Sequence, residues 1–496
     1  MYDVVIVGAG IAGCACAHFL ARYDLNILVV DASYDIATGT TRANSGIVHG
    51  GYDPEPGTLK ARFNIEGSRM YPGLARDLGF DFRQNGSLVV AFSEEERPNI
   101  EKLYARGITN GVEGLRIIES DELHEKEPLL NPAAVAALWV PTGGIVDPYG
   151  ITLAFAETAA CNGVTFKFDT CVSDIRRAEN NWELIIDNPE GTSQTLEARI
   201  VINAAGLNSG LLNSYVSKEN DFKITPRAGE YLLLDKIWGN AFTSTVFQVP
   251  TAAGKGVLVS PTVEGNLLIG PNAVAREHTY ETQTTNEGLA QILKDASKTW
   301  VKIPAGDAIT NFAGLRSTCV ESPDFHLGEP ADAPGFFNIC GFDSPGLTAA
   351  PAVGKYFAEI ISERLQAAEK PAYIDHRDAP RHLSTMSDSE IALAVAENPA
   401  WGRVVCRCEQ VSEAEIVEAL RSPVPARTVD AIKWRTRAGM GRCQAGFCLP
   451  LTIELIAKEH GIELTQVCKG SHDSRLILGE RGFLNELPHI SMGGAC

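Results

Sequence analysis

Four cysteines near the end of the chain are spaced so that they could hold metal together. Cys406 and Cys408 form a C-x-C pair, and Cys443 and Cys448 form a C-x4-C pair. Thiolates bind zinc and iron–sulfur clusters, and such a group in a chain with no recognisable export signal is more typical of a metal site than of disulfides. Four thiolates suit either Zn2+ or a [2Fe–2S] cluster, although paired zinc ligands more often follow C-x-x-C.

The residues between and beside these cysteines predict a small helical unit. Ser412 to Leu420 has the pattern of an amphipathic helix that opens with the capping box SEAE. We expect Arg437, Arg442 and the backbone N–H groups of the turn GMGRCQAGF to offset the charge of the thiolates.

A candidate acid–base residue lies in the stretch 38–62, TGTTRANSGIVHGGYDPEPGTLKAR. This stretch is rich in Gly, Thr, Asn and Pro, which predicts an ordered loop. Within it His49 is the side chain whose unperturbed pKa lies near neutrality, and Arg42 and Lys60 are possible anion ligands. The alternative is a loop that merely packs on the fold.

Three cations lie beside glycine-rich turns in the stretch 222–325, which alternates strand-like runs with turns. Arg227, Lys255 and Arg316 are placed as expected for side chains that point into a ligand cavity. A single arginine beside a turn is more often a solvated surface residue. Arg316 is different because it lies inside the apolar run FAGLRS.

The element that must position these groups begins at residue 3. Val4 to Val7 predicts a buried parallel strand, Ile11 to Arg22 a helix, and Ile27 to Val30 a second strand that ends at Asp31. Between the first strand and the helix, Gly8, Gly10 and Gly13 form GxGxxG. These glycines allow a tight turn, close approach of a pyrophosphate and close helix packing, while the acid can bind ribose hydroxyls. The alternative, an ordinary glycine turn, would not require the flanking strands or the acid.

Two later segments return the chain to this fold. The strand-like run Ala198 to Ile202 leads into NAAGLNS, where Ala205 and Gly206 let a strand end approach a ligand. The segment 341–361, GFDSPGLTAAPAVGKYFAEII, is a second glycine-rich loop that opens a helix whose free N–H groups can face an electron-rich ring.

Composition excludes several classes of function. With 496 residues, 45% hydrophobic residues and a formal net charge of −19, the chain is an ordinary globular protein of two to four domains without the basic footprint of a nucleic-acid binder. The longest uncharged run, Pro128 to Val146, is broken by prolines and glycines, so we expect no membrane span. No signal peptide fits before residue 3, which favours a cytoplasmic protein that would meet a membrane only through a partner.

Six motifs resemble one branch of the D-amino-acid-oxidase-like flavoproteins, the FAD-dependent glycerol-3-phosphate and 2-hydroxyglutarate dehydrogenases. They are GAGIAG with Asp31, RANSGIVHGGYDPEPGTLKA, VDPYG, INAAGLNS, PRAGEYLLL and DSPGLTAAPAVG, over about residues 1–372. NSGIVHGGYD followed by PGTLKA is closer to the hydroxyglutarate enzymes. The resemblance implies that FAD contacts Gly8, Gly10, Gly13, Asp31, Thr41, Arg42, Asn44, Ser45, Ala205, Gly206, Gly341, Ser344, Gly346, Leu347 and Thr348.

The same resemblance implies roles for the candidate chemical residues. His49 would be the base or a hydrogen-bonding orienter beside the flavin, and Arg316, with Arg227 and Lys255, would hold the phosphate or carboxylate of a small anionic substrate. Arg316 and His49 are therefore the predicted catalytic residues.

The C-terminal stretch also resembles a known domain. CRCE, KWRTRAGMGRCQ and the C-x4-C pair, over about residues 402–456, are similar to the bacterioferritin-associated-ferredoxin-like [2Fe–2S] domain that is appended to the anaerobic glycerol-3-phosphate dehydrogenase large subunit. This implies a cluster on Cys406, Cys408, Cys443 and Cys448, with zinc as the alternative.

We therefore expect an α/β chain with a Rossmann-like FAD-binding domain built from about 1–90, 141–215 and 326–372. A β-rich substrate lobe, about 216–325, is inserted into it. A linker, 373–400, leads to a small α-helical [2Fe–2S] domain, 401–460, and the tail 461–496 is unassigned.

The first functional hypothesis is oxidation of sn-glycerol 3-phosphate to dihydroxyacetone phosphate by hydride transfer to FAD. Electrons would leave singly through the cluster to a partner subunit or a quinone-linked complex. The second is the same chemistry on a 2-hydroxy acid. The third is an electron-transfer or scaffold subunit whose substrate pocket is idle.

Overall fold

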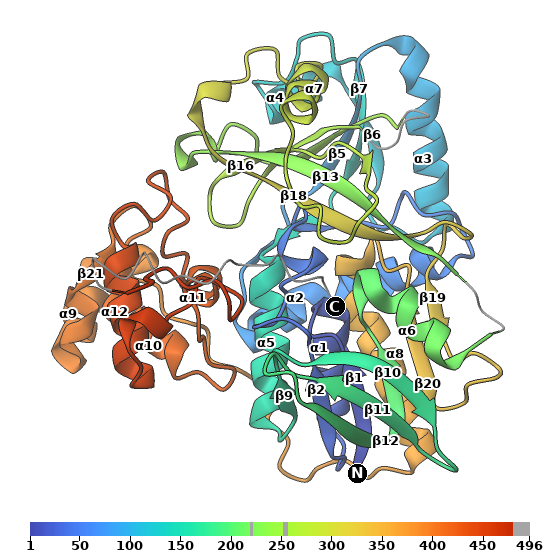
Figure 1. Cartoon of the computed structure of the whole chain (residues 1–496). Coiled ribbons are helices and arrows are strands. Elements are labelled where there is room, and N and C mark those ends of the chain that lie inside the picture. Colours follow the sequence, from blue (N-terminus) through green and yellow to red (C-terminus); the bar gives the residue numbers. More distant parts are fainter. Residues whose placement is uncertain (219–221, 251–255, 480–496) are drawn as a thin grey trace.

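Three bodies make up the computed structural model, which describes residues 1–218, 222–250 and 256–479 (Figure 1). The dinucleotide fold, built on the sheet that contains the N-terminal strand, occupies the lower part of the view. A second body, the β lobe, lies above it, and a helical C-terminal unit (388–479) lies to one side. The α/β fold class predicted from the sequence is confirmed.

The dinucleotide fold is organised around β1 (Tyr2–Val7). This strand lies between β2 (Ile27–Val30) and β12 (Ser193–Asn203) and is parallel to both. The eight-stranded sheet has the order β10-β11-β12-β1-β2-β9, with β20 beside β12 and β19 beside β20. Its remaining strands are β9 (Thr165–Lys167), β10 (Cys171–Arg177), β11 (Trp182–Asp187), β19 (His326–Gly328) and β20 (Phe336–Cys340).

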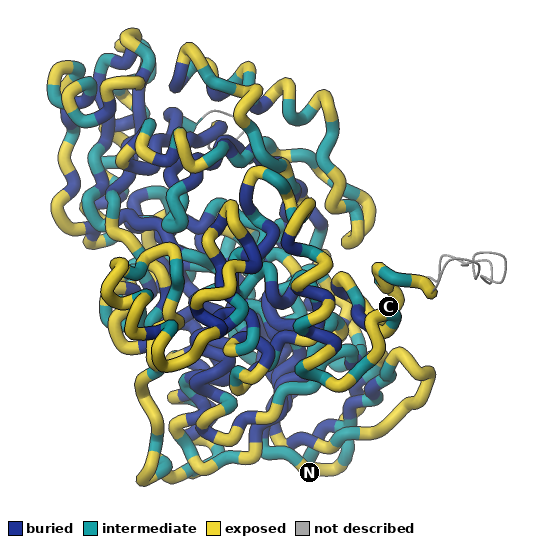
Figure 2. The backbone as a smooth tube through the Cα atoms, turned by 90° about the vertical axis from the view of Figure 1, so that its left-hand side faces the viewer, coloured by how far each residue is buried: buried dark blue, intermediate teal, exposed yellow. Residues whose placement is uncertain are grey.

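Helices cover this sheet and bury it. α1 (Ile11–Leu20) packs against α5 (Pro148–Cys161) and α8 (Gly346–Leu365), and α2 (Leu59–Leu78) packs against α8. α6 (Ser209–Val216) packs against β10 and β20. Figure 2 shows that the buried parts of the backbone are concentrated in this body. The apolar core forms two clusters, one with Val4 and Ile6 of β1 and the other with Val5 and Val7, as a strand covered on both faces requires.

The β lobe is larger than the sequence predicted, because it takes strands from two parts of the chain. Its nine-stranded sheet has the order β17-β13-β16-β15-β14-β5-β7-β6, with β18 beside β13. Three of these strands precede residue 141, so the lobe is not confined to about 216–325. The strands are β5 (Ser87–Ala91), β6 (Arg116–Glu119), β7 (Ala136–Val140), β13 (Ile224–Leu234), β14 (Thr245–Gln248), β15 (Leu258–Pro261), β16 (Leu267–Gly270), β17 (Val274–Ala275) and β18 (Ala308–Cys319).

Short elements join the two bodies and cover the lobe. A three-stranded sheet of β3 (Ile47–Val48), β8 (Gly144–Val146) and β4 (Phe82–Arg83) lies at the junction. The helices α3 (Arg97–Thr109), α4 (Ser120–Lys126) and α7 (Asn286–Ala296) pack on the strands of the lobe. Among the described residues, no helix combines the length and the apolar character that crossing a membrane requires.

The C-terminal unit contains α9 (Asp388–Glu397), β21 (Val404–Cys406), β22 (Val411–Ser412), α10 (Glu413–Leu420), α11 (Val429–Thr436) and α12 (Leu449–His460). The predicted capping box at Ser412 and Glu415 is present. The predicted linker 373–400 is only partly a linker: a capping box at Ser387 starts α9, and Ala394 packs against Trp401. The described part of the tail packs on the unit, where Lys469 pairs with Asp430 at 2.7 Å.

A buried ion pair anchors this unit to the dinucleotide fold. Arg435, at the end of α11, donates to both carboxylate oxygens of Asp35 at 2.6 and 2.8 Å and also to the hydroxyl of Tyr149. Only 2% of the Arg435 side chain and 5% of the Asp35 side chain are exposed. Trp434 stacks on Tyr149 and on the guanidinium of Arg42.

We predict that Arg435→Met destabilises the C-terminal unit by about 3–5 kcal/mol, because it leaves Asp35 buried without its counter-charge. Urea denaturation followed by tryptophan fluorescence measures the effect. Arg421→Met is the control. The Arg421 side chain, which pairs with Glu459, is 67% exposed, so loss of this pair is expected to lower the free energy of unfolding by less than about 1 kcal/mol. Equal destabilisation by the two variants would contradict the anchoring role.

Candidate active site and cysteine site

A cavity of about 1670 Å3 lies between the dinucleotide fold and the β lobe. Its wall includes His49 and both described candidate cations, Arg227 and Arg316. Most of the residues expected to contact a dinucleotide also line it, namely Gly8, Gly10, Asp31, Thr41, Asn44, Ser45, Ala205, Gly206, Ser344, Gly346 and Leu347. Residues from distant parts of the sequence are therefore brought to one site, as the resemblance implies.

The glycine turn after β1 is built for close approach. Gly8 has φ +111°, and a Cβ there would lie 2.4 Å from the carbonyl oxygen of Ala204. A Cβ on Gly13 would lie 1.9 Å from the carbonyl oxygen of Gly8, so the helix can pack only with glycine at this position. Gly10 precedes α1 without a side-chain cap of its own; the N–H of Ile11 donates to the hydroxyl of Thr41 at 3.1 Å, and the next N–H groups of the first turn can face a pyrophosphate.

Asp31 is held in place at the end of β2. Its two carboxylate oxygens accept hydrogen bonds from the backbone N–H groups of Ala9 at 2.7 Å and Ser33 at 2.8 Å. Burial raises the pKa of Asp31 to about 6, although these two donors act in the opposite direction. At neutral pH the carboxylate is therefore ionised and can accept hydrogen bonds from ribose hydroxyls.

His49 lies where the loop after β3 meets the start of α8. Its backbone N–H donates to the hydroxyl of Thr348 at 2.9 Å, and its backbone carbonyl accepts from the amide of Asn64 at 2.6 Å. Its ring Nε2 lies 3.3 Å from the hydroxyl of Ser344. The imidazole thus lines the cavity on a backbone that is fixed from two sides.

Some residues expected to contact FAD do not line the cavity but support the residues that do. Thr348 orients His49, and Arg42 donates to the hydroxyl of Tyr34 at 2.9 Å while it stacks on Trp434. Gly341 packs against Cys319 behind the loop that leads to α8. These three, like Gly13, are absent from the wall of the cavity. Lys255 lies outside the described residues.

Lys60, an expected anion ligand, lines the cavity but already has a carboxylate partner. Its ammonium group lies 2.6 Å from Asp343, and the two side chains are mostly buried. This pair fastens the start of α2 to the loop before α8, so its charge is largely compensated.

The lobe presents two arginines side by side. In the antiparallel pairing of β13 and β18, Arg227 lies directly opposite Arg316, and both line the cavity. Directly opposed like charges repel unless an anion lies between them. The next pair on the same face is Gly229 and Gly314. The missing side chain of Gly229 leaves room for the guanidinium of Arg316, because a Cβ on Gly229 would lie 2.6 Å from it.

Sequence reasoning missed other residues of the wall. Tyr231 lines the cavity, and its hydroxyl lies 3.2 Å from that of Ser45. The period of two along β13 places Arg227, Gly229 and Tyr231 on one face, and this alternation is the signal that could have identified it. Phe247, whose ring centroid is 6.0 Å from that of His49, comes from an apolar strand that carried no comparable signal.

The four cysteines lie in the C-terminal unit as two pairs. The sulfur atoms of Cys408 and Cys443 are 3.4 Å apart. Cys406, at the end of β21, accepts a hydrogen bond from the thiol of Cys448, at the start of α12. Within the described part of the chain, no three His, Cys, Asp or Glu side chains are arranged to hold a single metal ion. Two pairs suit the two irons of a [2Fe–2S] cluster.

Hydrogen bonds around one pair favour a thiolate. The thiol of Cys448 and the backbone N–H groups of Gly439 and Glu409 donate to Cys406 and lower its pKa to about 6. Of the groups expected to offset the thiolate charge, the backbone N–H of Gly439 donates to Cys406. The two arginines have carboxylate partners: Arg437 pairs with Glu409 of the same unit, and Arg442 pairs with Asp235 of the lobe at 3.0 Å.

Comparison with known proteins agrees with this geometry. The family model "FAD dependent oxidoreductase" matches residues 3–360, and the model "BFD-like [2Fe-2S] binding domain" matches residues 404–458. Glycerol 3-phosphate dehydrogenase of Caloramator mitchellensis is 42% identical over 97% of this chain and 98% of its own length. L-2-hydroxyglutarate dehydrogenase of Pongo abelii is 32% identical over 74% of this chain and 88% of its own length.

A solved structure shares the fold of the larger part. L-alpha-glycerophosphate oxidase from Mycoplasma pneumoniae, with FAD bound, superimposes with a TM-score of 0.72 at 32% identity and covers 77% of this chain and 99% of its own. Both predicted cofactors, FAD and the [2Fe–2S] cluster, are thereby confirmed, and the zinc alternative falls. The chain belongs to the FAD-dependent oxidoreductase family and carries a BFD-like [2Fe–2S] binding domain at its C-terminal end.

Proposed function

We propose that this protein is a dehydrogenase that oxidises sn-glycerol 3-phosphate to dihydroxyacetone phosphate and releases the electrons through its [2Fe–2S] cluster. The observation that carries the proposal is the opposed pair Arg227 and Arg316 in the wall of the cavity that also contains His49. Two adjacent guanidinium groups suit a dianionic phosphate, and a nearby imidazole suits removal of a hydroxyl proton. The names of the relatives in Caloramator and Mycoplasma support the same substrate.

Each residue then has a defined task in the reaction. Arg316 and Arg227 bind the phosphate and orient the secondary alcohol. His49 accepts the hydroxyl proton at Nε2, where the substrate hydroxyl takes the place of the Ser344 hydroxyl that lies 3.3 Å away. Apolar neighbours such as Phe247 exclude water from the reacting carbon. Bound FAD supplies the hydride acceptor.

Electrons then require a separate acceptor, and the surface near the cysteines supports a protein in that role. Cys408 is exposed, and Phe447, next to Cys448, is 83% exposed. An exposed aromatic side chain beside a redox centre is typical of a surface that another protein covers. We propose that a partner protein, itself able to be part of a quinone-linked complex, takes the electrons here.

The deciding experiment is anaerobic mixing of the holoprotein with glycerol 3-phosphate or with 2-hydroxyglutarate while flavin absorbance is recorded. Bleaching by glycerol 3-phosphate supports the proposal. Bleaching by 2-hydroxyglutarate alone favours the second hypothesis, which the relative from Pongo abelii keeps open. Bleaching by neither substrate, with both cofactors present, favours an idle pocket.

We expect His49→Gln to slow flavin bleaching by glycerol 3-phosphate about 10²–10⁴-fold, because the alcohol loses its proton acceptor. Flavin content is expected to stay unchanged, since the backbone contacts of residue 49 remain. The control His376→Gln removes an imidazole that is 73% exposed and is expected to leave the rate unchanged. A wild-type rate in His49→Gln would remove this residue from the mechanism.

Arg316→Ala is expected to raise the KM for glycerol 3-phosphate about 10- to 100-fold, the loss of a charged hydrogen bond to the phosphate. Steady-state kinetics with an artificial electron acceptor measures this. Arg116→Ala on β6, at the far edge of the same sheet, is the matched control and is expected to leave KM unchanged. Unaltered KM in Arg316→Ala would place the phosphate elsewhere.

Cys408→Ser is expected to abolish electron delivery to a one-electron protein acceptor such as cytochrome c, while glycerol 3-phosphate still bleaches the flavin. The reason is that the serine hydroxyl replaces a thiolate that the cluster needs. Iron analysis and EPR confirm loss or damage of the cluster. Cys161→Ser, at an exposed cysteine outside the C-terminal unit, serves as the control. Continued reduction of cytochrome c by cluster-free protein would show that electrons leave directly from the flavin.

A further inference from the structure

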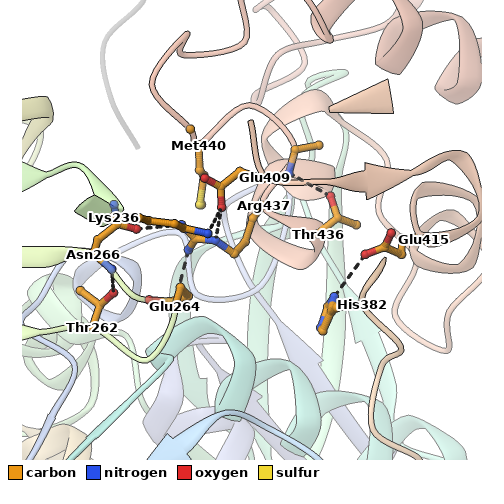
Figure 3. A network of polar contacts seen from close by, with 12 residues as sticks. Lys236, Thr262, Glu264, Asn266, His382, Glu409, Glu415, Thr436, Arg437 and Met440 are labelled. Carbon is orange, nitrogen blue, oxygen red and sulfur yellow. Dashed lines mark hydrogen bonds and ion pairs between the residues drawn. The ribbon is translucent and has the colours of Figure 1, made fainter. Parts of the chain in front are cut away.

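Arg437 lies where the cysteine-bearing loops meet the β lobe (Figure 3). It directly follows α11 and precedes Gly439, whose N–H donates to Cys406. Its backbone is left-handed, with φ +66°, a conformation that non-glycine residues rarely adopt. The chain therefore turns sharply at this residue, and its side chain lies between Glu409, which follows Cys408, and the turn 262–266 of the lobe.

The guanidinium of Arg437 joins groups from both bodies. Nε donates to Glu409 Oε2 at 2.8 Å, Nη2 donates to Asn266 Oδ1 at 3.3 Å, and Nη1 lies 3.6 Å from Glu264 Oε1. Glu409 directly follows Cys408, whereas Glu264 and Asn266 belong to the turn between β15 and β16 of the lobe. Lys236 of the lobe reaches the same oxygen of Glu409 at 2.9 Å.

These four charges form a compensated set in which the carboxylates are mostly buried and the cations are partly exposed. Two cations, Arg437 and Lys236, face two carboxylates, Glu409 and Glu264. The Glu409 side chain is only 4% exposed, so separation of the two bodies would leave charge without its partner in a poorly solvated place. The contact thus fixes the cysteine loops against the lobe more firmly than exposed pairs do.

The charge of Arg437 also acts on a residue close to the wall of the cavity. The buried carboxyl of Asp147, which follows β8, has a pKa raised to about 7 by burial and by Glu264, and lowered by the charge of Arg437. Val146 donates its backbone N–H to Gly46 at 2.8 Å, and Gly46 donates to Asn44, which lines the cavity. The charges of Glu264 and Arg437 thus act on a buried carboxyl whose neighbour Val146 is hydrogen-bonded to the cavity loop 44–46.

We propose that Arg437 and Glu409 are positioning residues that set the rate of electron transfer from FAD to the [2Fe–2S] cluster. By locking the cysteine-bearing loops to the lobe, which forms one wall of the cavity, they hold the cluster at a fixed separation from the flavin. Each alcohol oxidised yields two electrons and two protons: the protons pass to the base and solvent, and the electrons cross to the cluster one at a time. With ferricyanide as the final acceptor, two molecules are reduced to ferrocyanide per substrate.

The inference rests on the proposed function only for its natural electron source, so the test uses two sources. Holoprotein is reduced anaerobically either by glycerol 3-phosphate or by deazaflavin photoreduction, which needs no substrate site. Flavin absorbance reports the first step, and rapid-freeze EPR of the reduced cluster reports the second. Failure of glycerol 3-phosphate alone to bleach the flavin would contradict the proposed function and leave the inference testable by light.

Arg437→Ala is expected to leave the rate of flavin bleaching by substrate within about twofold and to slow cluster reduction about tenfold or more, because small displacements of reacting groups are costly. A second variant changes only the lobe: Lys236→Met with Glu264→Gln removes the two charged partners that the lobe supplies and leaves the C-terminal unit unchanged. We expect the same result, near-normal flavin bleaching with slowed cluster reduction. Arg403→Ala, which breaks the exposed pair with Glu413 inside the C-terminal unit, is the matched control and is expected to change neither rate.

Hydrogen exchange distinguishes positioning from general destabilisation. In the lobe variant we expect faster exchange in the loops 406–410 and 437–448 but unchanged exchange in α10 and α12, with iron content and the EPR line shape of the reduced cluster retained. Wild-type cluster reduction in the lobe variant, or equal slowing in Arg403→Ala, would overturn the proposal.

Discussion

Two arginines at the end of a short helix, one buried and one partly exposed, link the C-terminal unit to the other two bodies. Arg435 reaches Asp35 of the dinucleotide fold, and Arg437, two residues later, reaches Glu264 of the β lobe. Because Arg435 and Asp35 meet away from water, separation of these two bodies would leave charge buried without its partner, and the partly exposed pair of Arg437 and Glu264 adds a second link. The loop that carries Cys443 and Cys448 follows this helix, and Glu409, next to Cys408, pairs with Arg437, so the place of both cysteine-bearing loops relative to the cavity depends on these contacts.

The cavity shows the same principle of assembly from distant segments. Its floor is the dinucleotide fold, where glycines let the backbone approach a ligand, and its other wall is a twisted sheet that contributes Arg227 and Arg316 from paired strands. The opposed arginines repel each other in the absence of an anion, a local cost that makes sense only at a binding site. The charged groups of the cavity thus come from the β lobe, and the glycine turns that admit a ligand come from the dinucleotide fold.

Much of this arrangement could be predicted from local patterns. The strand–glycine turn–helix–strand–acid order of residues 3–31 identified the dinucleotide fold, because each of its residues has a role that few other residue types can fill. The cysteine spacing likewise predicted the metal site. The extent of the lobe was not predictable, since runs such as Ser87–Ala91 are short and apolar and do not reveal which sheet they join.

The sequence by itself determined the chemistry: which groups can bind a dinucleotide, an anion and iron is decided by residue type and close spacing along the chain. Only the tertiary structure decided where the longer side chains go. It paired Arg437 with Glu409 and with Glu264 of the lobe, paired Arg442 with Asp235 of the lobe and Lys60 with Asp343, and placed Tyr231 beside Ser45. The physical reason is that a charged side chain settles where desolvation is best compensated, and that partner comes from residues far away in the sequence.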